Sequence, residues 1–249
     1  MCTNYELQNI VLTRLFSCEN SFYLTGGTAL NRFYVPTRIS DDLDFFTSTT
    51  PLFHEFCSEI VQNISNDFET KRPVQERDFQ RIIVFHEEQT LQVDFVNDHV
   101  HRERKSKLYK DMRIDNLVDI LSNKLSTIIN REDAKDIVDI LSISNNYSFS
   151  WEHIIDVANK KQSMESSYLS SKMSRFPVNM LEHIKWTNSR TKDELALSLK
   201  ENLLQVCKDM ASQAQNSLGL SKTDLSEAVP FLDEHDPEDH QESGPCPSG

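Results

Sequence analysis

Two neighbouring glycines near the start of the chain could hold a phosphate group. Gly26 and Gly27 follow the apolar residues 22–24 and precede a helix-like run. Glycine lets the backbone approach a ligand closely, and the N-terminus of the helix that follows offers unpaired N–H groups to an anion. The pattern therefore predicts a strand–turn–helix unit that cradles phosphate.

Two carboxylates at positions i and i+2, Asp42 and Asp44, follow the glycines. On a strand these positions share one face, so both acids would converge while Leu43 and Phe45 enter the core. Adjacent carboxylates repel each other unless a cation lies between them, and Mg²⁺ prefers oxygen ligands. We expect a metal-binding acid pair beside the glycine turn, with Asp41 on the opposite face and dispensable.

Apolar periodicity predicts the elements that position these residues. Strands are expected at residues 22–25, 43–47, 68–74, 81–86 and 91–96, with a hairpin turn at 87–90, and helices at residues 5–16, 28–34 and 51–64. Later in the chain, helical spacing recurs at residues 151–160 and 193–210, whereas residues 163–174 show no clear pattern. This order puts the glycine turn after the first strand and the acid pair at the start of the second.

A third acid lies within the strand expected at residues 91–96. Leu91, Val93 and Phe95 share one face of this strand, and Asp94 points to the other. A lone acid in a strand is typical of an edge or solvent-facing position. The strand pattern alone therefore assigns no function to Asp94.

A lysine lies inside the apolar stripe of the helix that Asp115 or Asn116 caps. Lys124 falls seven residues after Leu117 and three after Leu121. Lysine is almost never fully buried without a partner. Its stem either reaches solvent at the edge of the stripe, or its ammonium group meets the phosphates of a nucleotide.

The chain resembles the AbiEii/AbiGii-type nucleotidyltransferases in two runs, GGTAL from Gly26 and RISDDLDFF from Arg38. This family belongs to the polymerase-β-like nucleotidyltransferases and includes the MenT-type toxins. The resemblance covers residues 22–141. It implies an α+β fold, with a nucleotidyltransferase lobe at residues 1–113, in which helices flank a small mixed sheet, and a helical lobe at residues 114–220.

The resemblance also implies roles for individual residues. Asp42, Asp44 and Asp94 would hold Mg²⁺, two ions in all, which Mn²⁺ could replace, and these acids would be catalytic together with Lys124. The NTP would be bound by Gly26, Gly27, Thr28, Arg38, Ser40 and Lys124. The run that includes Lys124, Arg131 and Asp136 is similar to the family's third motif, so Arg131 and Asp136 become candidate substrate contacts, although Asp136 faces away from the apolar side of its own helix.

The implied activity is transfer of a nucleoside monophosphate from an NTP to RNA, with the tRNA 3′ end as the expected acceptor. This role would belong to a toxin–antitoxin or phage-defence system, restrained by a separately encoded antitoxin protein. The same site could instead modify a small molecule such as an aminoglycoside, or a protein hydroxyl. A third reading is a non-catalytic module that binds a partner protein, against which the intact acid set argues.

Composition limits the class of protein. The 249 residues carry a formal net charge of −13, and 38% of them are hydrophobic. The length suffices for one large domain or two lobes, and the acidic balance argues against nonspecific coating of nucleic acid. Five scattered cysteines without CxxC spacing are typical of reduced thiols, and no apolar run suits a signal or a membrane span. We expect a soluble, cytoplasmic protein without a membrane partner.

Two charged segments remain. Residues 102–113 are basic and are either a solvated connector or a contact for the phosphate backbone of a nucleic acid. Residues 221–249 are acidic and poor in apolar side chains, so burial cannot compensate the entropy of ordering them. We expect these last residues to form a disordered tail.

Overall fold

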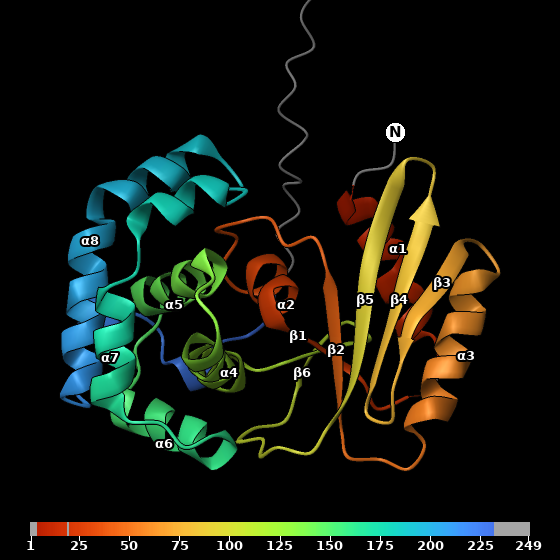
Figure 1. The fold of residues 1–249 in the computed structure, drawn as a ribbon, viewed down its shortest axis with the longest axis horizontal. Helices are drawn as coiled ribbons and strands as arrows, with labels where there is room; N and C mark the ends of the chain where they lie inside the picture. The colour runs from red at the N-terminus through yellow and green to blue at the C-terminus, as the bar shows by residue number, and fades with distance from the viewer. Residues whose placement is uncertain (1–3, 19, 232–249) are drawn as a thin grey trace, which may run out of the picture.

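A computed structural model describes residues 4–18 and 20–231 of the chain. Its strands are β1 (Tyr23–Thr25), β2 (Leu43–Ser48), β3 (Glu69–Gln75), β4 (Phe79–His86), β5 (Gln89–Asp98), β6 (Lys107–Tyr109) and β7 (Met112–Ile114). They form one mixed sheet in the order β3-β4-β5-β2-β1-β7-β6, so β3 and β6 are its edges (Figure 1). The expected α+β fold with a mixed sheet is confirmed.

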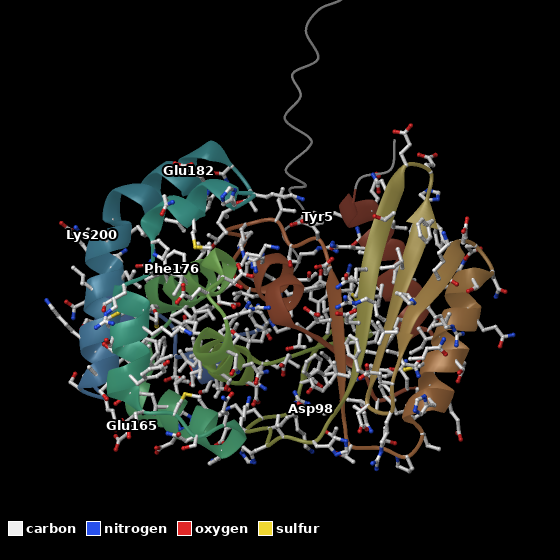
Figure 2. The ribbon with its side chains drawn as sticks, viewed as in Figure 1. Tyr5, Asp98, Glu165, Phe176, Glu182 and Lys200 are labelled. Carbon is white, nitrogen blue, oxygen red and sulfur yellow. The ribbon has the colours of Figure 1, made fainter. Side chains whose placement is uncertain are left out.

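The helices lie on both sides of this sheet. They are α1 (Asn4–Phe16), α2 (Gly26–Phe33), α3 (Phe53–Ser65), α4 (Leu117–Asn130), α5 (Ala134–Asn146), α6 (Trp151–Lys161), α7 (Ser166–Ser174) and α8 (Ser189–Ala211), with 3-10 turns η1 (Val178–His183), η2 (Ser217–Gly219) and η3 (Leu225–Glu227). Helices α1 and α3 contact each other and the sheet, whereas α2 contacts β1 and β2 as well as α4 and α5. A continuous cluster of buried apolar side chains therefore runs from the sheet into the helical half (Figure 2).

Strand pairing sets the positions of the acids. Strand β2 runs parallel to β5, and this register places Asp44 directly opposite Asp94. On its other side β2 is antiparallel to β1, where Thr25 lies opposite Asp44. Leu43 and Phe45 are fully buried between the acids, as the alternation predicts. The glycine turn at the end of β1 is thereby brought beside both strands that carry acids.

The segment after β5 contains structure that the sequence pattern did not predict. Residues 107–114 form a hairpin of the three-residue strands β6 and β7, and β7 pairs in parallel with β1 through Ile114 and Leu24. Strands this short carry too few alternating positions to give a recognisable period. Two further differences are α7, in a stretch without clear pattern, and α2, which begins at Gly26 itself.

The expected disordered tail is wrong for its first residues. Leu225 is buried in η3, and Ser148 forms a β-bridge with Asp224. Near the end of this segment the Phe231 N–H donates to the carbonyl of Phe33 at 2.8 Å. The rest of the expected tail, residues 232–249, lies outside the described residues. In the ranges that are described, no helix is both long and apolar enough to cross a membrane.

Candidate active site

A cleft of about 640 Å³ lies between the sheet and helices α4 to α6. Its walls come from the glycine turn, the start of β2, the neighbouring strands β4 and β5, and one side of α4. The cleft gathers most of the residues that the sequence singled out: Gly26, Gly27, Arg38, Ser40, Asp42, Asp44, Asp94, Lys124 and Arg131. Thr28 and Asp136 do not line it.

The glycine turn packs tightly against the acid-bearing segment. Gly26 has a φ of 70°, and a Cβ there would lie 2.5 Å from the Asp44 Oδ2 atom. A Cβ on Gly27 would lie 2.6 Å from Arg38 Nη2 and 2.8 Å from Ser40 Oγ. Side chains at these positions would therefore displace the groups that form the cleft wall.

Thr28, which was expected to bind NTP, has a different position. It is fully buried, and its hydroxyl donates to the backbone carbonyl of Asp42. This bond ties the first turn of α2 to the residue that precedes β2. Thr28 therefore supports the backbone of Asp42 from the protein interior and does not line the cleft.

Asp44 is the most strained of the three acids. Burial, together with the charges of Asp94 and Asp42, raises its pKa to about 6 against the effect of Lys124. Its carboxylate accepts no hydrogen bond from the residues described. Asp42 is exposed just before β2, and its pKa is raised by desolvation and by the charges of Asp41 and Asp94. Mutually repelling oxygen donors of this kind fit a divalent cation.

Asp94 has a protein cation as its partner. Arg81 of β4 lies opposite Asp94 in the sheet, and its Nε and Nη2 atoms are each 2.7 Å from one carboxylate oxygen. Among the described residues, no three His, Cys, Asp or Glu side chains are grouped closely enough to hold a metal. Asp94 must therefore exchange Arg81 for the cation if it is to act as a ligand.

The sequence reasoning missed Arg81. The turn expected at residues 87–90 would set Asp94 opposite Ile83, whereas the structure has a two-residue turn at 87–88, which fixes the register between β4 and β5. Counting back from that turn places Arg81 opposite Asp94, as a cross-strand pair of opposite charge.

Lys124 lies at the centre of a buried ion network. Its Nζ atom is 2.9 Å from Asp136 Oδ1 and 2.7 Å from Asp139 Oδ2. Arg38 binds the same Asp139 with two donors, Nε at 2.8 Å and Nη2 at 2.7 Å. All four side chains are buried. Lys124 therefore neither reaches solvent with its stem nor extends an unpaired ammonium group into the cleft. The guanidinium group of Arg38 is likewise already paired, with Asp139.

Charge pairing stabilises the ionised acids of this network. Burial would raise the pKa of Asp139, but Lys124 and Arg38 outweigh it and bring the pKa to about 2. The helix pattern placed Asp136 on an outward face; in fact it is fully buried and binds Lys124 and Arg131. Arg131 is 55% exposed and donates to both oxygens of Asp136, at 2.9 and 3.2 Å. Asp139, which sequence reasoning had given no role, is thus the residue that holds Arg38 and Lys124 together.

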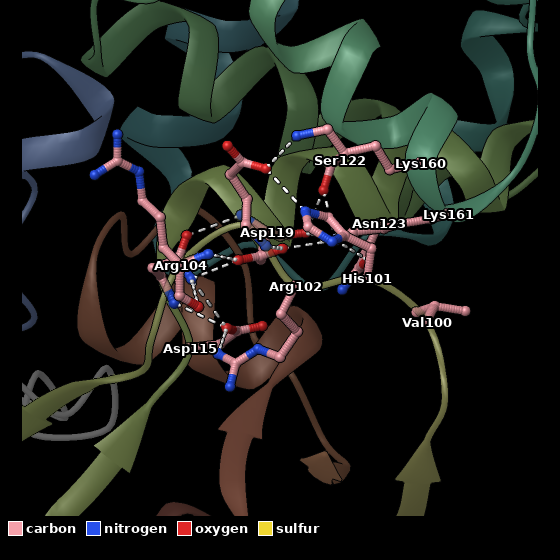
Figure 3. A network of polar contacts seen from close by, with 12 residues as sticks. Val100, His101, Arg102, Arg104, Asp115, Asp119, Ser122, Asn123, Lys160 and Lys161 are labelled. Carbon is pink, nitrogen blue, oxygen red and sulfur yellow. Dashed lines mark hydrogen bonds and ion pairs between the residues drawn. The ribbon is translucent and has the colours of Figure 1, made fainter. Parts of the chain in front are cut away.

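The basic segment 102–113 is largely used inside the protein. Arg102 forms an ion pair with Asp115 (Figure 3), with an N···O distance of 2.7 Å, and stacks over the ring of Tyr23. Arg113 donates to the Phe22 carbonyl, and Lys107 to carbonyls of the C-terminal segment. These three cations therefore have partners within the protein, whereas Arg104, Lys105 and Lys110 are exposed, so both predictions for the segment, a nucleic-acid contact and a solvated connector, stay predictions.

A second pair in Figure 3 joins this segment to two helices. Lys161 of α6 is 2.8 Å from Asp119 of α4, and Asp119 also accepts hydrogen bonds from the backbone N–H groups of Glu103 and Arg104. Lys161 lines the cleft, but its amine also donates to Ser122 and Asn123. It ties α6 to α4 at the wall of the cleft.

Comparison with known proteins shows which family and which solved structures this chain is similar to. Residues 10–209 match the model of the family described as nucleotidyl transferase AbiEii toxin, type IV toxin–antitoxin system. A crystal structure of a candidate nucleotidyltransferase from H. pylori is similar, with a TM-score of 0.56, 20% identity and coverage of 84% of this chain and 95% of that one. The structure of JHP933 from Helicobacter pylori has a TM-score of 0.51, 19% identity and coverage of 84% and 88%. No curated protein matches the sequence.

Proposed function

Because the chain belongs to the AbiEii family of nucleotidyl transferase toxins, we propose that it transfers a nucleoside monophosphate from an NTP to the 3′ hydroxyl of an RNA. The tRNA 3′ end is the acceptor of first choice. The observation that carries the proposal is the parallel pairing that sets Asp44 opposite Asp94, beside a glycine turn and inside one cleft. That arrangement provides oxygen donors and a phosphate-binding backbone at the same place.

Mg²⁺ fits the donor set of this site. Asp42, Asp44 and Asp94 would hold it, with Mn²⁺ as a replacement. Burial and the charges of Asp94 and Asp42 raise the pKa of Asp44, and a bound cation would oppose that effect. When bound, the metal would neutralise charge on the phosphates and acidify the attacking hydroxyl. In our proposal two ions bind, as the resemblance implies.

The chain's own residues would orient the triphosphate. The N–H groups at the start of α2 face an anion that reaches the glycine turn, and Ser40 Oγ lies beside Gly27. Arg131 contributes an exposed guanidinium on the cleft wall. Arg38 and Lys124 are buried in the cleft wall, where Asp139 fixes their positions. Their positive charges would stabilise the triphosphate from there.

The reaction exchanges one phosphoester bond for another. The acceptor hydroxyl oxygen attacks the α-phosphorus, and the bond from this phosphorus to the oxygen that bridges to the β-phosphate breaks. Pyrophosphate leaves with that electron pair, and the hydroxyl proton passes to a carboxylate of the site, which we assign to Asp94 once Arg81 has released it. As a toxin of this kind the protein would be restrained by an antitoxin protein encoded separately.

One experiment tests the activity and the acceptor together. The purified protein is incubated with each labelled NTP, Mg²⁺ and total tRNA, in parallel with Asp44→Ala and with Asp41→Ala as a matched control at the neighbouring acid. We expect label to enter RNA with the unaltered protein and the control, and not with Asp44→Ala. Label that enters only protein or an added aminoglycoside would contradict the RNA acceptor, and no label in any acceptor would contradict the proposal altogether.

A further inference from the structure

We propose that a second cavity, adjacent to the cleft, binds the 3′-terminal nucleoside of the acceptor RNA. The cavity has a volume of about 380 Å³ and lies between the end of α4, the start of α5 and helix α7. Arg131 and Asp133 line both this cavity and the cleft, so the two spaces meet at these residues. The inference rests on the proposed transfer to RNA, and it adds where that RNA is held.

The cavity combines an apolar floor with an exposed aromatic ring. Met173 and Phe176 are buried at its base, and Figure 2 shows Phe176 on the inner side of the helical half. Tyr168, also on its wall, is 55% exposed and has no hydrogen bond or ring contact with the described residues. An aromatic ring exposed beside an apolar floor provides the stacking surface that proteins use for unpaired bases.

The charges of the cavity suit a nucleotide whose phosphate stays at the rim. Arg175 ends α7, is exposed and forms no ion pair within the described ranges. Lys172 donates to the carbonyl of Ile129 at 2.9 Å and keeps further N–H donors for a ligand. Glu132 would repel a phosphate but can accept hydrogen bonds from ribose hydroxyls. The base and ribose therefore belong inside, and the phosphate belongs near Arg175 and Lys172.

Position explains why this cavity serves the acceptor rather than the NTP. The acids and the glycine turn lie in the cleft, so the triphosphate is bound there. A terminal nucleoside stacked on Tyr168 would enter the cleft past Arg131, whose exposed guanidinium is held in place by Asp136. Because Arg102, Lys107 and Arg113 have partners within the protein, the side of the molecule that carries this cavity is the better candidate for binding RNA.

The test uses a short single-stranded RNA whose 3′-terminal residue is 4-thiouridine, added to the full chain. Light-induced crosslinking should join this residue to the peptide that contains residues 166–176. Tyr168→Ala and Arg175→Ala should each weaken RNA binding about tenfold, within the range that one stacked base or one charged contact contributes. Tyr168→Phe keeps the ring and should bind RNA like the unaltered protein.

Two controls separate the cavity from the cleft. Binding of NTP in the absence of RNA should be the same in all these variants, because none of them lines the cleft. Lys200→Ala removes an exposed cation of α8 that does not line the cavity, and should leave RNA binding unchanged.

The outcomes distinguish this inference from the proposed function. If label enters RNA but Tyr168→Ala and Arg175→Ala bind it like the unaltered protein, or if the crosslink maps outside both walls of the cavity, residues 128–137 and 166–176, only the subsite is overturned. If the unaltered protein neither binds nor labels RNA, both proposals are overturned. Binding of an aminoglycoside, and not of RNA, in the cavity would also overturn the subsite.

Discussion

At the scale of single residues, Asp44 shows a conflict between function and stability. Its carboxylate is held out of water next to two other acids, and burial raises its pKa to about 6. A carboxyl group whose pKa is higher in the folded state destabilises that state once the pH exceeds its unfolded value. The cost therefore grows between about pH 4 and pH 6 and remains in full at neutral pH.

We predict that Asp44→Asn stabilises the metal-free protein at pH 7.5 by about 1–3 kcal/mol, while it abolishes nucleotidyl transfer. Chemical denaturation in EDTA at pH 7.5 and at pH 4 measures the effect. The gain should be largely lost at pH 4, where the wild-type carboxyl group is protonated in the folded state and about half protonated in the unfolded state. A variant that is less stable than the unaltered protein at pH 7.5 would show that Asp44 is not strained.

Arg81 and a metal ion compete for the same carboxylate. Because Arg81 donates to both oxygens of Asp94, we predict that Arg81→Gln tightens Mn²⁺ binding about tenfold, the order of one charge-assisted hydrogen bond. Mn²⁺ titration followed by electron paramagnetic resonance, without NTP, reports this affinity. Arg77→Gln, which removes an exposed cation from the same region, is the matched control. Equal affinity in Arg81→Gln and the unaltered protein would mean that Asp94 is not a ligand.

At the scale of elements, the residues after α8 depend on a close backbone approach. A Cβ on Gly219 would lie 1.9 Å from the carbonyl oxygen of Tyr147, at the end of α5. Only a shift of backbone can relieve that contact, and we predict that Gly219→Ala lowers the free energy of unfolding by about 1–3 kcal/mol. Urea denaturation measures it, with the exposed Leu220→Ala as the control. Equal stability of Gly219→Ala and the control would show that η2 can move without cost.

How much of the fold and of the candidate site could be predicted from the sequence depends on how many residues carry the pattern of each element. The positions of Asp42 and Asp44 follow from an apolar run with two-residue alternation, and α4 follows from a capped apolar stripe. The hairpin β6–β7 could not be found this way, since three residues give no period and its pairing with β1 is a long-range choice of the fold.

The ion network around Lys124 could not be predicted from the sequence, for a different reason. Lys124 and Asp136 looked like surface or substrate residues because each was considered on its own helix. Their burial follows from the packing of α4 on α5 and from the presence of Asp139 and Arg38 between them. A buried charge becomes acceptable only with such partners, and a helix pattern does not contain them. Arg81 was missed for a local reason, because the turn expected at residues 87–90 is two residues longer than the turn at 87–88 and shifts the register of the hairpin.

At the scale of the whole molecule, the C-terminal segment joins both halves. Lys107 of β6 donates to the carbonyls of Ser226 and Ala228, and Leu225 is buried against the body of the protein. We predict that a chain that ends at residue 220 is less stable by about 3–5 kcal/mol than one that ends at residue 231, because it loses these contacts. Thermal and urea unfolding of the two truncations provide the measurement.

A point variant checks the same segment without a change of length. Leu225→Ala should cost about 2–3 kcal/mol if the leucine is as buried as the structure shows. Equal stability of both truncations would mean that residues 221–231 do not hold the halves together. The acidic composition of residues 221–249 concealed this role, since a few apolar side chains that dock on an existing surface do not need a core of their own.

The two edges of the sheet have a consequence for how copies of the protein meet. Strand β3 breaks its register between Lys71 and Val74, and Arg72 and Pro73 lie in that break. Proline has no N–H to donate to an added strand, and the basic side chains of one copy repel those of another. At the other edge, β6 is short and bound by the C-terminal segment. Neither edge of the sheet in the described residues thus offers a neighbouring copy a template for adding its own backbone, and we expect concentrated solutions to resist fibrillar growth.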